Sequence, residues 1–376
     1  DNSFGNFILN SGVTAGGTAM STVDARSVSL RDTGGVFNVA DVTAGSDLRI
    51  QSNIVNHPGF DAVLTKTGAG TLELTGANTY TGATNVAGGA LTLSDGGRLG
   101  GGTYNAPISL GAGAVLNFNM TNNQNLEGAL TGTGTLAQNT AADFLYMSGD
   151  QSAFVGTFHN MAGSMFLASS AANSPAGARA RIDGGVLQIA PNGSGDGTWR
   201  IGALSGTGGA VQPNRNLAGR AITLEVGGLN TDTSYSGALR NNSNGTPSVL
   251  ALAKVGIGTL TLAATNTYTG GTTVEDGVLE VAATRALGSG PITINGGTVR
   301  LATTTYNALG TPSPAIVLGP GATLTAAQGG GNAHNLGPLT LNGGTLTTLN
   351  GPAGPATRRT AAAGRPSATA GRAGTS

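Results

Sequence analysis

One unit of this chain is the best guide to its architecture: Lys66-Thr67-Gly68-Ala69-Gly70-Thr71-Leu72-Glu73-Leu74, followed by Asn78-Thr79-Tyr80-Thr81-Gly82. It returns 188 residues later as Lys254-Val255-Gly256-Ile257-Gly258-Thr259-Leu260-Thr261-Leu262, followed by Asn266-Thr267-Tyr268-Thr269-Gly270. Aligned without gaps, residues 66–93 and 254–281 are identical at 15 of 28 positions. A unit of this length that recurs within one chain predicts a stacked, repetitive architecture rather than one compact globule.

The composition points the same way. Glycine accounts for 65 of 376 residues, well above its usual share of about 7%. Only 10% of residues are charged and the net charge is zero, so no long-range field attracts nucleic acid or an anionic membrane. Cysteine is absent, which suits a protein that crosses an oxidising compartment before it folds. No apolar run is long enough for a transmembrane helix.

Short alternating segments fill the chain. Thr71-Leu72-Glu73-Leu74-Thr75 places both leucines on one face, and many such segments end at a glycine that is followed by another short strand. Strands of three to five residues are not stable alone, but stacked on one another they find backbone partners about 4.8 Å above and below. We therefore predict an all-β chain folded as a right-handed parallel β-helix, a solenoid of about 15 coils, with the hand set by the rule for parallel crossovers.

The pattern divides the chain into two parts. Residues 1–350 are expected to form the β-helix, with full repeat copies at 66–93 and 254–281 and weaker ones near 132–167 and 206–237. Residues 351–376 contain Arg, Ala, Gly, Pro, Thr and Ser but no large apolar side chain. Because such a segment cannot bury a core, we expect a disordered basic tail.

The identities within the repeat define a structural signature in which glycines supply sharp corners and the aromatic ring fills a corner. Its members are Lys66, Gly68, Gly70, Leu72, Leu74, Asn78, Tyr80, Gly82, Gly89, Lys254, Gly256, Gly258, Leu260, Leu262, Asn266, Tyr268, Gly270 and Gly277. Phe154 and Tyr235 mark the weaker copies, and an exposed ring that stacks on sugar is the alternative role for these aromatics.

The unit Lys-x-Gly-x-Gly-Thr-Leu-x-Leu-x-x-x-Asn-Thr-Tyr-Thr-Gly resembles the passenger-associated transport repeat, the autotransporter-associated β-strand repeat of bacterial type V secretion. The resemblance implies a β-helical passenger that passes through the periplasm and crosses the outer membrane with an outer-membrane β-barrel translocator as partner. It also implies a location on the bacterial cell surface or outside the cell. Neither the translocator nor a signal peptide is recognisable in this sequence, so we expect a passenger fragment or a truncated gene product.

Motifs for chemistry are scarce. His57, His159 and His334 are scattered without metal-ligand spacing, and no nucleophile elbow or phosphate-binding loop appears. The adjacent acids Glu275 and Asp276 are replaced by Ala87 and Gly88 in the other copy, which favours a solvated turn. The run Asn192–Gly197 is similar to a calcium-binding repeat, but it is a single copy. The sequence therefore predicts no catalytic, cofactor-binding or metal-binding residue.

The leading interpretation is a non-enzymatic, surface-exposed or secreted passenger segment that acts as a stalk or adhesion-type scaffold. Its repeats would aid folding and transport, and a host surface or a glycan is the partner considered. Two alternatives remain open at this point. One is a polysaccharide lyase or glycoside hydrolase that uses carboxylates from adjacent coils. The other is a structural element that assembles through its open terminal strands.

Overall fold

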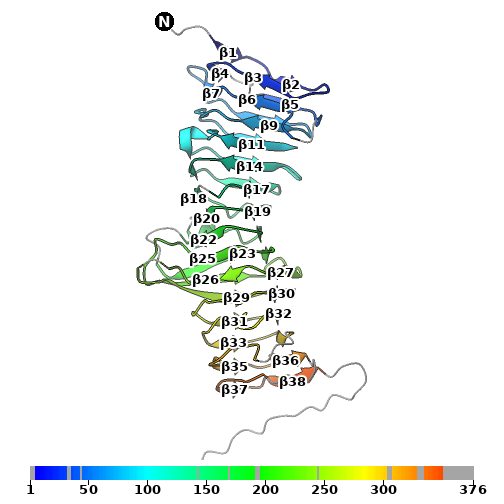
Figure 1. The fold of residues 1–376 in the computed structure, drawn as a ribbon, viewed down its shortest axis with the longest axis vertical. Coiled ribbons are helices and arrows are strands. Elements are labelled where there is room, and N and C mark those ends of the chain that lie inside the picture. Colours follow the sequence, from blue (N-terminus) through cyan, green and yellow to red (C-terminus); the bar gives the residue numbers. More distant parts are fainter. Residues whose placement is uncertain are drawn as a thin grey trace, which may run out of the picture.

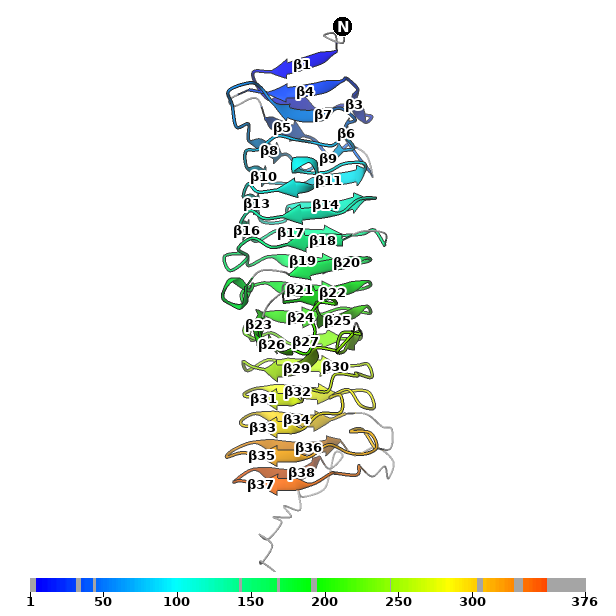
Figure 2. The ribbon, with the colours of Figure 1, turned by 90° about the vertical axis from the view of Figure 1, so that its left-hand side faces the viewer.

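The protein is a long column of stacked coils (Figures 1 and 2). The computed structural model describes residues 5–31, 35–42, 45–141, 144–167, 170–190, 195–243, 245–302, 307–327 and 334–349. The predicted disordered tail, 351–376, lies outside the described residues, and the division of the chain at residue 350 stays a prediction. Each coil of the chain stacks on the coil before it, so residues about 20 to 30 apart in sequence are neighbours in space (Figure 2).

Strands line the column in parallel ladders, and the pairings between the strands of the described residues are all parallel. The longest ladder contains β3 (Ser21–Val23), β6 (Leu48–Ile50), β9 (Thr71–Leu74), β11 (Ala90–Asp95), β14 (Val115–Met120), β17 (Thr135–Gln138), β19 (Thr157–Asn160), β21 (Arg179–Ile182) and β24 (Ala203–Ser205). A six-stranded sheet follows it, with β27 (Thr233–Tyr235), β30 (Thr259–Leu262), β32 (Val278–Val281), β34 (Thr298–Leu301), β36 (Thr323–Ala327) and β38 (Thr345–Leu349).

The remaining sheets form the other sides. One has β2 (Val13–Ala15), β5 (Val36–Val39), β8 (Leu64–Thr67), β10 (Thr84–Val86), β13 (Ile108–Leu110) and β16 (Leu130–Gly132). Lower in the column lie β23 (Gly197–Ile201), β26 (Ala221–Val226), β29 (Val249–Lys254), β31 (Thr272–Val274), β33 (Ile292–Ile294), β35 (Ile316–Leu318) and β37 (Leu339–Leu341). The third side has β1 (Asn6–Leu9), β4 (Ser27–Leu30) and β7 (Asn53–Asn56), and then β12 (Thr103–Tyr104), β15 (Gln124–Leu126), β18 (Phe144–Met147), β20 (Ser164–Leu167), β22 (Val186–Ile189), β25 (Ala210–Pro213) and β28 (Ala238–Leu239). Two short 3-10 turns, η1 (Gly100–Gly102) and η2 (Ala171–Asn173), interrupt the strands.

The interior is a dry column of aliphatic and aromatic side chains. Leu72 pairs in register with Leu91, Leu91 with Leu116, and Leu116 with Leu136, and all four are fully buried. Each coil therefore covers the apolar side chains of the coil before it, which none of the short strands could do alone. The predicted all-β, parallel β-helix is confirmed.

The regular coil is broken where loops beside β25 and β26 project sideways from the column (Figure 1). The loop after β25 and the loop after β28 are joined through Asn242, whose Nδ2 donates to the carbonyl oxygens of Asn214 (2.8 Å) and Leu217 (2.7 Å). The Asn242 Oδ1 accepts the backbone N–H of Ser248 at 2.7 Å. This buried amide holds the two loops together as one lateral projection.

Candidate functional site

The repeat lysines lie inside the protein. Lys66 and Lys254 are 0% and 1% exposed, and they are the two lysines of the chain. The Lys66 ammonium donates to the carbonyl oxygens of Thr67 (2.7 Å), Gly68 (2.9 Å) and, one coil further on, Gly88 (3.1 Å). Lys254 repeats this arrangement with Val255, Gly256 and Asp276 at 2.8, 2.6 and 3.3 Å. We call this arrangement the lysine bridge, because it ties the corner of one coil to the corner of the next.

Burial lowers the pKa of Lys66 to about 8, although the charge of Asp47 acts in the opposite direction. Burial also lowers the pKa of Lys254, against the raising effect of Asp276 and Asp232. Three carbonyl oxygens within hydrogen-bond distance favour the ammonium form. Lys66 therefore remains mostly charged at neutral pH despite its burial.

The repeat asparagines connect three coils. The Asn78 Oδ1 accepts the N–H of Ile54 in the preceding coil at 3.0 Å, and its Nδ2 donates to the carbonyl oxygen of Arg98 in the following coil at 3.1 Å. Asn266 likewise accepts from Leu239 at 2.7 Å and donates to Ala286 at 2.6 Å. At this corner the chain bends, and some backbone N–H and C=O groups have no partner in the strand ladders. The side-chain amide of the asparagine supplies their hydrogen bonds.

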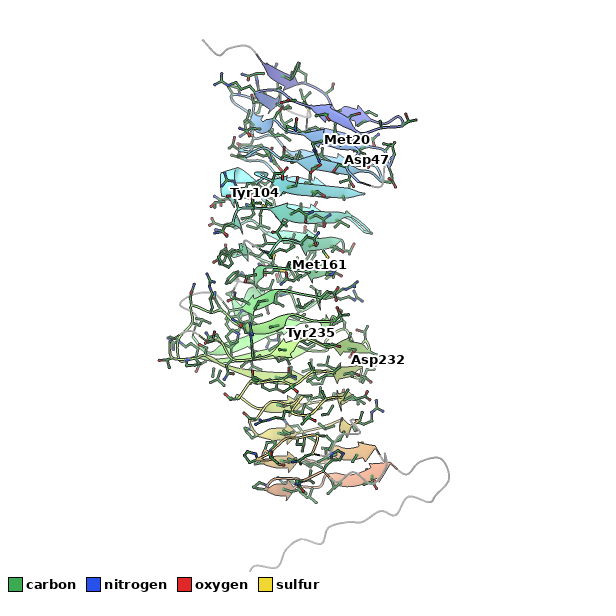
Figure 3. All side chains as sticks on the ribbon, viewed as in Figure 1. Met20, Asp47, Tyr104, Met161, Asp232 and Tyr235 are labelled. Carbon is green, nitrogen blue, oxygen red and sulfur yellow. The ribbon has the colours of Figure 1, made fainter. Side chains whose placement is uncertain are left out.

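The repeat tyrosines are buried plugs with a polar partner. Tyr80 is fully buried and its hydroxyl lies 2.7 Å from the Thr84 hydroxyl. The Thr84 hydroxyl in turn lies 2.7 Å from the hydroxyl of Tyr104, whose place in the column is labelled in Figure 3. Tyr268 is equally buried, 2.5 Å from Thr272. Since neither ring reaches the surface, the alternative of an exposed sugar-stacking ring does not apply to these two positions.

The repeat glycines leave no room for a side chain. Gly68 has φ of 76°, and a Cβ there would lie 2.3 Å from the carbonyl oxygen of Val39 in the preceding coil. Gly256 has φ of 69°, with the carbonyl oxygen of Gly227 at 2.3 Å. The other signature residues are also close to neighbouring coils or inside the core: Gly70, Gly82, Gly89, Gly258, Gly270 and Gly277 approach backbone atoms, and Leu72, Leu74, Leu260 and Leu262 are buried.

The weaker copies keep the buried aromatic ring but lack the threonine that hydrogen-bonds to the tyrosine hydroxyl in the full copies. Phe154 and Tyr235 are fully buried, and each forms an isolated bridge to the glycine of the coil before, Gly132 and Gly206. Leu239 stands four residues after Tyr235, where Thr272 follows Tyr268 in the full copy. Among the described residues, the Tyr235 hydroxyl accordingly has no hydrogen-bond partner.

The candidates for chemistry do not converge. His57 packs near Phe60, with 5.7 Å between ring centroids, and the His334 Nδ1 accepts the N–H of Ala308 at 3.2 Å. His159 Nε2 lies 2.9 Å from the Asp183 carboxylate. Within the part of the chain that the structure describes, no group of three or more acidic or histidine side chains could hold a metal ion. Residues 192–194 of the calcium-like run lie outside that part.

The acid pair Glu275 and Asp276 occupies an exposed corner between β31 and β32. Glu275 accepts two hydrogen bonds from Asn295 Nδ2, at 3.0 and 3.1 Å, and the Asp276 carboxylate accepts the N–H of Gly277 at 2.7 Å. Both carboxylates thus serve the turn itself, as expected for adjacent residues of a solvated corner.

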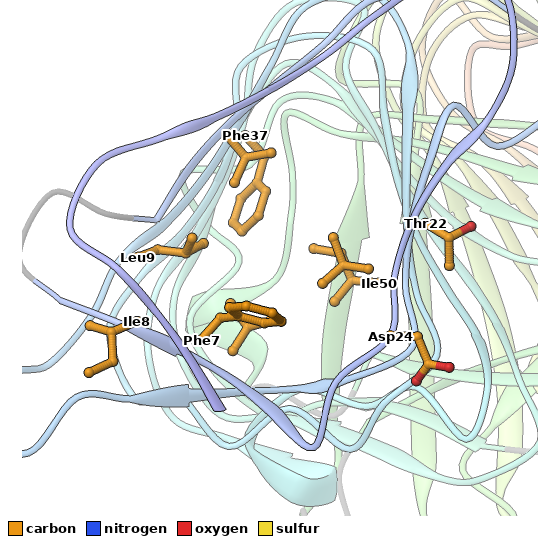
Figure 4. A pocket seen from close by; sticks show the side chains of 10 residues that line it. Phe7, Ile8, Leu9, Thr22, Asp24, Phe37 and Ile50 are labelled. Carbon is orange, nitrogen blue, oxygen red and sulfur yellow. The ribbon is translucent and has the colours of Figure 1, made fainter. Parts of the chain in front are cut away.

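A cavity of about 410 Å³ opens at the N-terminal end of the column. Phe7, Leu9, Phe37 and Ile50 surround the hollow, whereas Ile8 points away from it (Figure 4). Phe7 and Ile8 are more than half exposed. The lining is the same aliphatic and aromatic set as the interior below, so this cavity is the open end of the core.

One cluster on the outer side of the column was not predicted from the sequence. Phe144 and Tyr146 of β18 and Phe166 of β20 lie on the outer side of their sheet, and Arg215 covers the Phe144 ring at 4.4 Å. We call these four residues the outer aromatic cluster. The signal was present in the run Phe144-Leu145-Tyr146-Met147, which is apolar on both faces although only one face of an outer strand is buried in the core.

Comparison with known proteins places the repeats in a family. Residues 64–93 and 252–281 match the passenger-associated-transport-repeat family. Over 287 residues, 69% of this chain, the sequence is 34% identical to the adhesin BmaC autotransporter of Brucella suis biovar 1 (strain 1330). The chain spans only 8% of the length of that relative. No solved structure matches the chain. Among the described residues, no helix is both long and apolar enough to cross a membrane.

Proposed function

We propose, from a chain that carries two passenger-associated transport repeats and is related to an adhesin autotransporter, that this β-helix is a stalk or adhesion-type scaffold. It would be displayed on the bacterial surface or secreted, after crossing the outer membrane with the help of a translocator. The protein is not an enzyme in this proposal. Three observations support that part: Glu275 and Asp276 are held in an exposed turn, the three histidines lie in different coils, and the carboxylate beside His159 is also bound by Arg181 and Thr207.

The two repeats would aid folding of the passenger during export. The observation that carries this proposal is the lysine bridge together with the neighbouring asparagine. Asn78 and Asn266 hydrogen-bond to the coils before and after their own. Lys66 and Lys254 bond within their own corner and to the following coil. Until the following coil docks, the ammonium lacks one of its three acceptors and the amide lacks the acceptor that this coil supplies, and an unmet hydrogen bond at a corner that is to be buried is costly. A repeat coil is therefore an unfavourable place for folding to stop.

Refolding kinetics test the folding role. The Asn266→Ala and Lys254→Met variants are expected to slow refolding from urea in proportion to their loss of stability, because the bridge forms while coils are being added. Leu187→Ala removes a buried side chain of β22 outside both repeats and serves as the matched control. It is expected to accelerate unfolding instead. Repeat variants that alter only the unfolding rate would refute the folding role.

The two lysines offer a direct reporter for this experiment. Because both are buried, an amine-reactive reagent should label them only in coils that have opened or have not yet formed. Pulse labelling during refolding, followed by mass spectrometry, then gives the time at which each repeat closes. Surface display is tested separately: protease added to intact producing cells should remove the chain, and complete protection would contradict display.

A further inference from the structure

The outer aromatic cluster lies outside the core. In β18, Leu145 and Met147 point inward and belong to the core, whereas Phe144 and Tyr146 alternate with them and are half-buried. Tyr146 stacks on Phe166 with 4.2 Å between centroids and 21° between planes, and Phe144 meets Phe166 edge-on at 5.7 Å. Phe166 is fully buried, and the half-buried rings of Phe144 and Tyr146 both pack against it.

The cluster begins a column of side chains that runs along the rod. In the strand register, Tyr146 pairs with Phe166, Phe166 with Gln188, and Gln188 with Gln212. Arg240 continues the column one coil further, with its Nε donating to Gln212 Oε1 at 2.8 Å. Two rings, two amides and a guanidinium therefore follow one another at the coil spacing of about 4.8 Å.

The lateral projection adds positive charge beside this column. Arg215 and Arg220 lie on the loop after β25, and Arg240 is exposed on the loop after β28. Within the described ranges, none of these three forms an ion pair with a carboxylate, unlike Arg200, which pairs with Glu225 at 3.1 Å. Unpaired guanidinium groups next to aromatic rings are suited to a ligand with carboxylates.

We propose that the outer aromatic cluster and Arg240 form a binding site for a linear acidic oligosaccharide built from uronic acids. A sugar ring would lie on Tyr146, its carboxylate would pair with Arg215, and the chain would follow the column toward Arg240. This site deepens the proposed adhesion role and rests on it, since such a glycan is met outside the cell. A protein partner fits less well, because a stable protein interface needs about 800 Å² on each side and the rings here are few and half-buried.

Titration calorimetry of the whole chain with hexagalacturonate tests the site, and neutral maltohexaose serves as the uncharged probe. We expect binding of hexagalacturonate that Tyr146→Ala or Arg215→Glu weakens by about tenfold. Arg31 lies over the Phe60 ring at 5.4 Å, in the N-terminal coils, and provides a matched control. Arg31→Glu makes the same change in charge at another cation–π pair and should leave the affinity unchanged.

Several results would overturn the site. They are no binding of hexagalacturonate by the parent chain, equal binding of maltohexaose, or an equal loss in Arg31→Glu and Arg215→Glu. Circular dichroism checks that each variant is folded, and Arg215→Gln, which also removes the charge but introduces none, replaces Arg215→Glu if that variant fails. Adherence to cells that survives Tyr146→Ala and Arg215→Gln refutes this site but leaves the adhesion proposal standing. Oligosaccharide binding without any adherence refutes the adhesion proposal instead.

Discussion

The ammonium group of Lys66 donates to the carbonyl oxygen of Gly88, which lies 22 residues later and one coil further along the column. Lys254 makes the equivalent contact with Asp276. A charge buried at the corner of a coil thus depends on the next coil for one of its three acceptors. In a solenoid, where each coil otherwise contacts only its neighbours through strand ladders, these lysines strengthen the coupling between adjacent coils at two places.

Replacement of either lysine should destabilise the protein. Lys66→Met keeps the length of the side chain but leaves three corner carbonyls without their donor, so we expect a loss of about 1–3 kcal/mol in the free energy of unfolding. Urea denaturation measures it. Arg200→Met also removes one positive charge, but from an exposed ion pair, and should cost less than about 1 kcal/mol. Equal losses of unfolding free energy in the two variants would show that the buried lysine bridge stabilises the protein no more than an exposed ion pair does.

The same lysine predicts an unusual dependence of stability on alkaline pH. The pKa of Lys66 is about 8 in the folded protein, against an ordinary value of 10.5. Between these values the unfolded chain binds more protons than the folded chain, so the stability should rise with pH from about 8 upward. Burial raises the pKa of Tyr80, and that of Tyr104 to about 12, so stability should fall again once unfolded tyrosine ionises near pH 10. Urea midpoints at closely spaced pH values should reveal the rise in the parent chain and a smaller one in Lys66→Met.

The sequence was sufficient for the architecture because the strand pattern is local. The alternation in Thr71-Leu72-Glu73-Leu74 assigns the two leucines to the core, and the recurrence of the same pattern requires stacking. The outer aromatic cluster could not be predicted in the same way. Phe144-Leu145-Tyr146-Met147 is apolar at every position, so only the register with the neighbouring strands shows which pair of side chains faces outward.

The contacts of the repeat signature were also beyond the sequence. The sequence showed that Lys66 and Asn78 recur in the second repeat. Their acceptors, however, are the backbone carbonyl oxygens of Gly88 and Arg98, which belong to the next coil. Which carbonyl lies above a given side chain depends on the length of the coil between them, and the coils here vary in length because of insertions such as the lateral projection. Only the three-dimensional stacking fixes these partners.

The two tyrosines Tyr235 and Tyr268 should respond differently to loss of the hydroxyl. Tyr268→Phe removes a buried hydrogen bond to Thr272 and is expected to cost about 1 kcal/mol. Tyr235→Phe removes a buried hydroxyl that has no hydrogen-bond partner within the described part of the chain, so it should be neutral or stabilising. Thermal unfolding of both single variants decides the matter. A larger loss for Tyr235→Phe than for Tyr268→Phe would contradict the difference in hydrogen bonding.

Two glycines with the same backbone conformation separate the cost of conformation from that of packing. Gly68 and Gly113 have φ of 76° and 73°, but a Cβ at Gly113 would meet no atom within 4 Å. Gly113→Ala should therefore cost about 1–2 kcal/mol, the price of a left-handed residue with a side chain. Gly68→Ala should cost distinctly more, because its Cβ would press on the preceding coil. Similar urea midpoints for the two variants would mean that the coils can separate at this corner without loss.

Acid conditions should weaken the protein through Asp183. Partial burial raises the pKa of this carboxyl, but hydrogen bonds from His159 and Thr207 and the charge of Arg181 outweigh it and hold the pKa at about 2. Since the ordinary value is 3.8, the unfolded chain takes up the proton first as the pH falls. The stabilisation is therefore complete above about pH 4 and is lost as the pH falls through about 2. Asp183→Asn should flatten the fall in the urea midpoint between pH 4 and 2, whereas Asp24→Asn, which alters an exposed carboxylate, should keep it. An unchanged pH profile in Asp183→Asn would mean that the four-residue cluster does not couple proton binding to folding.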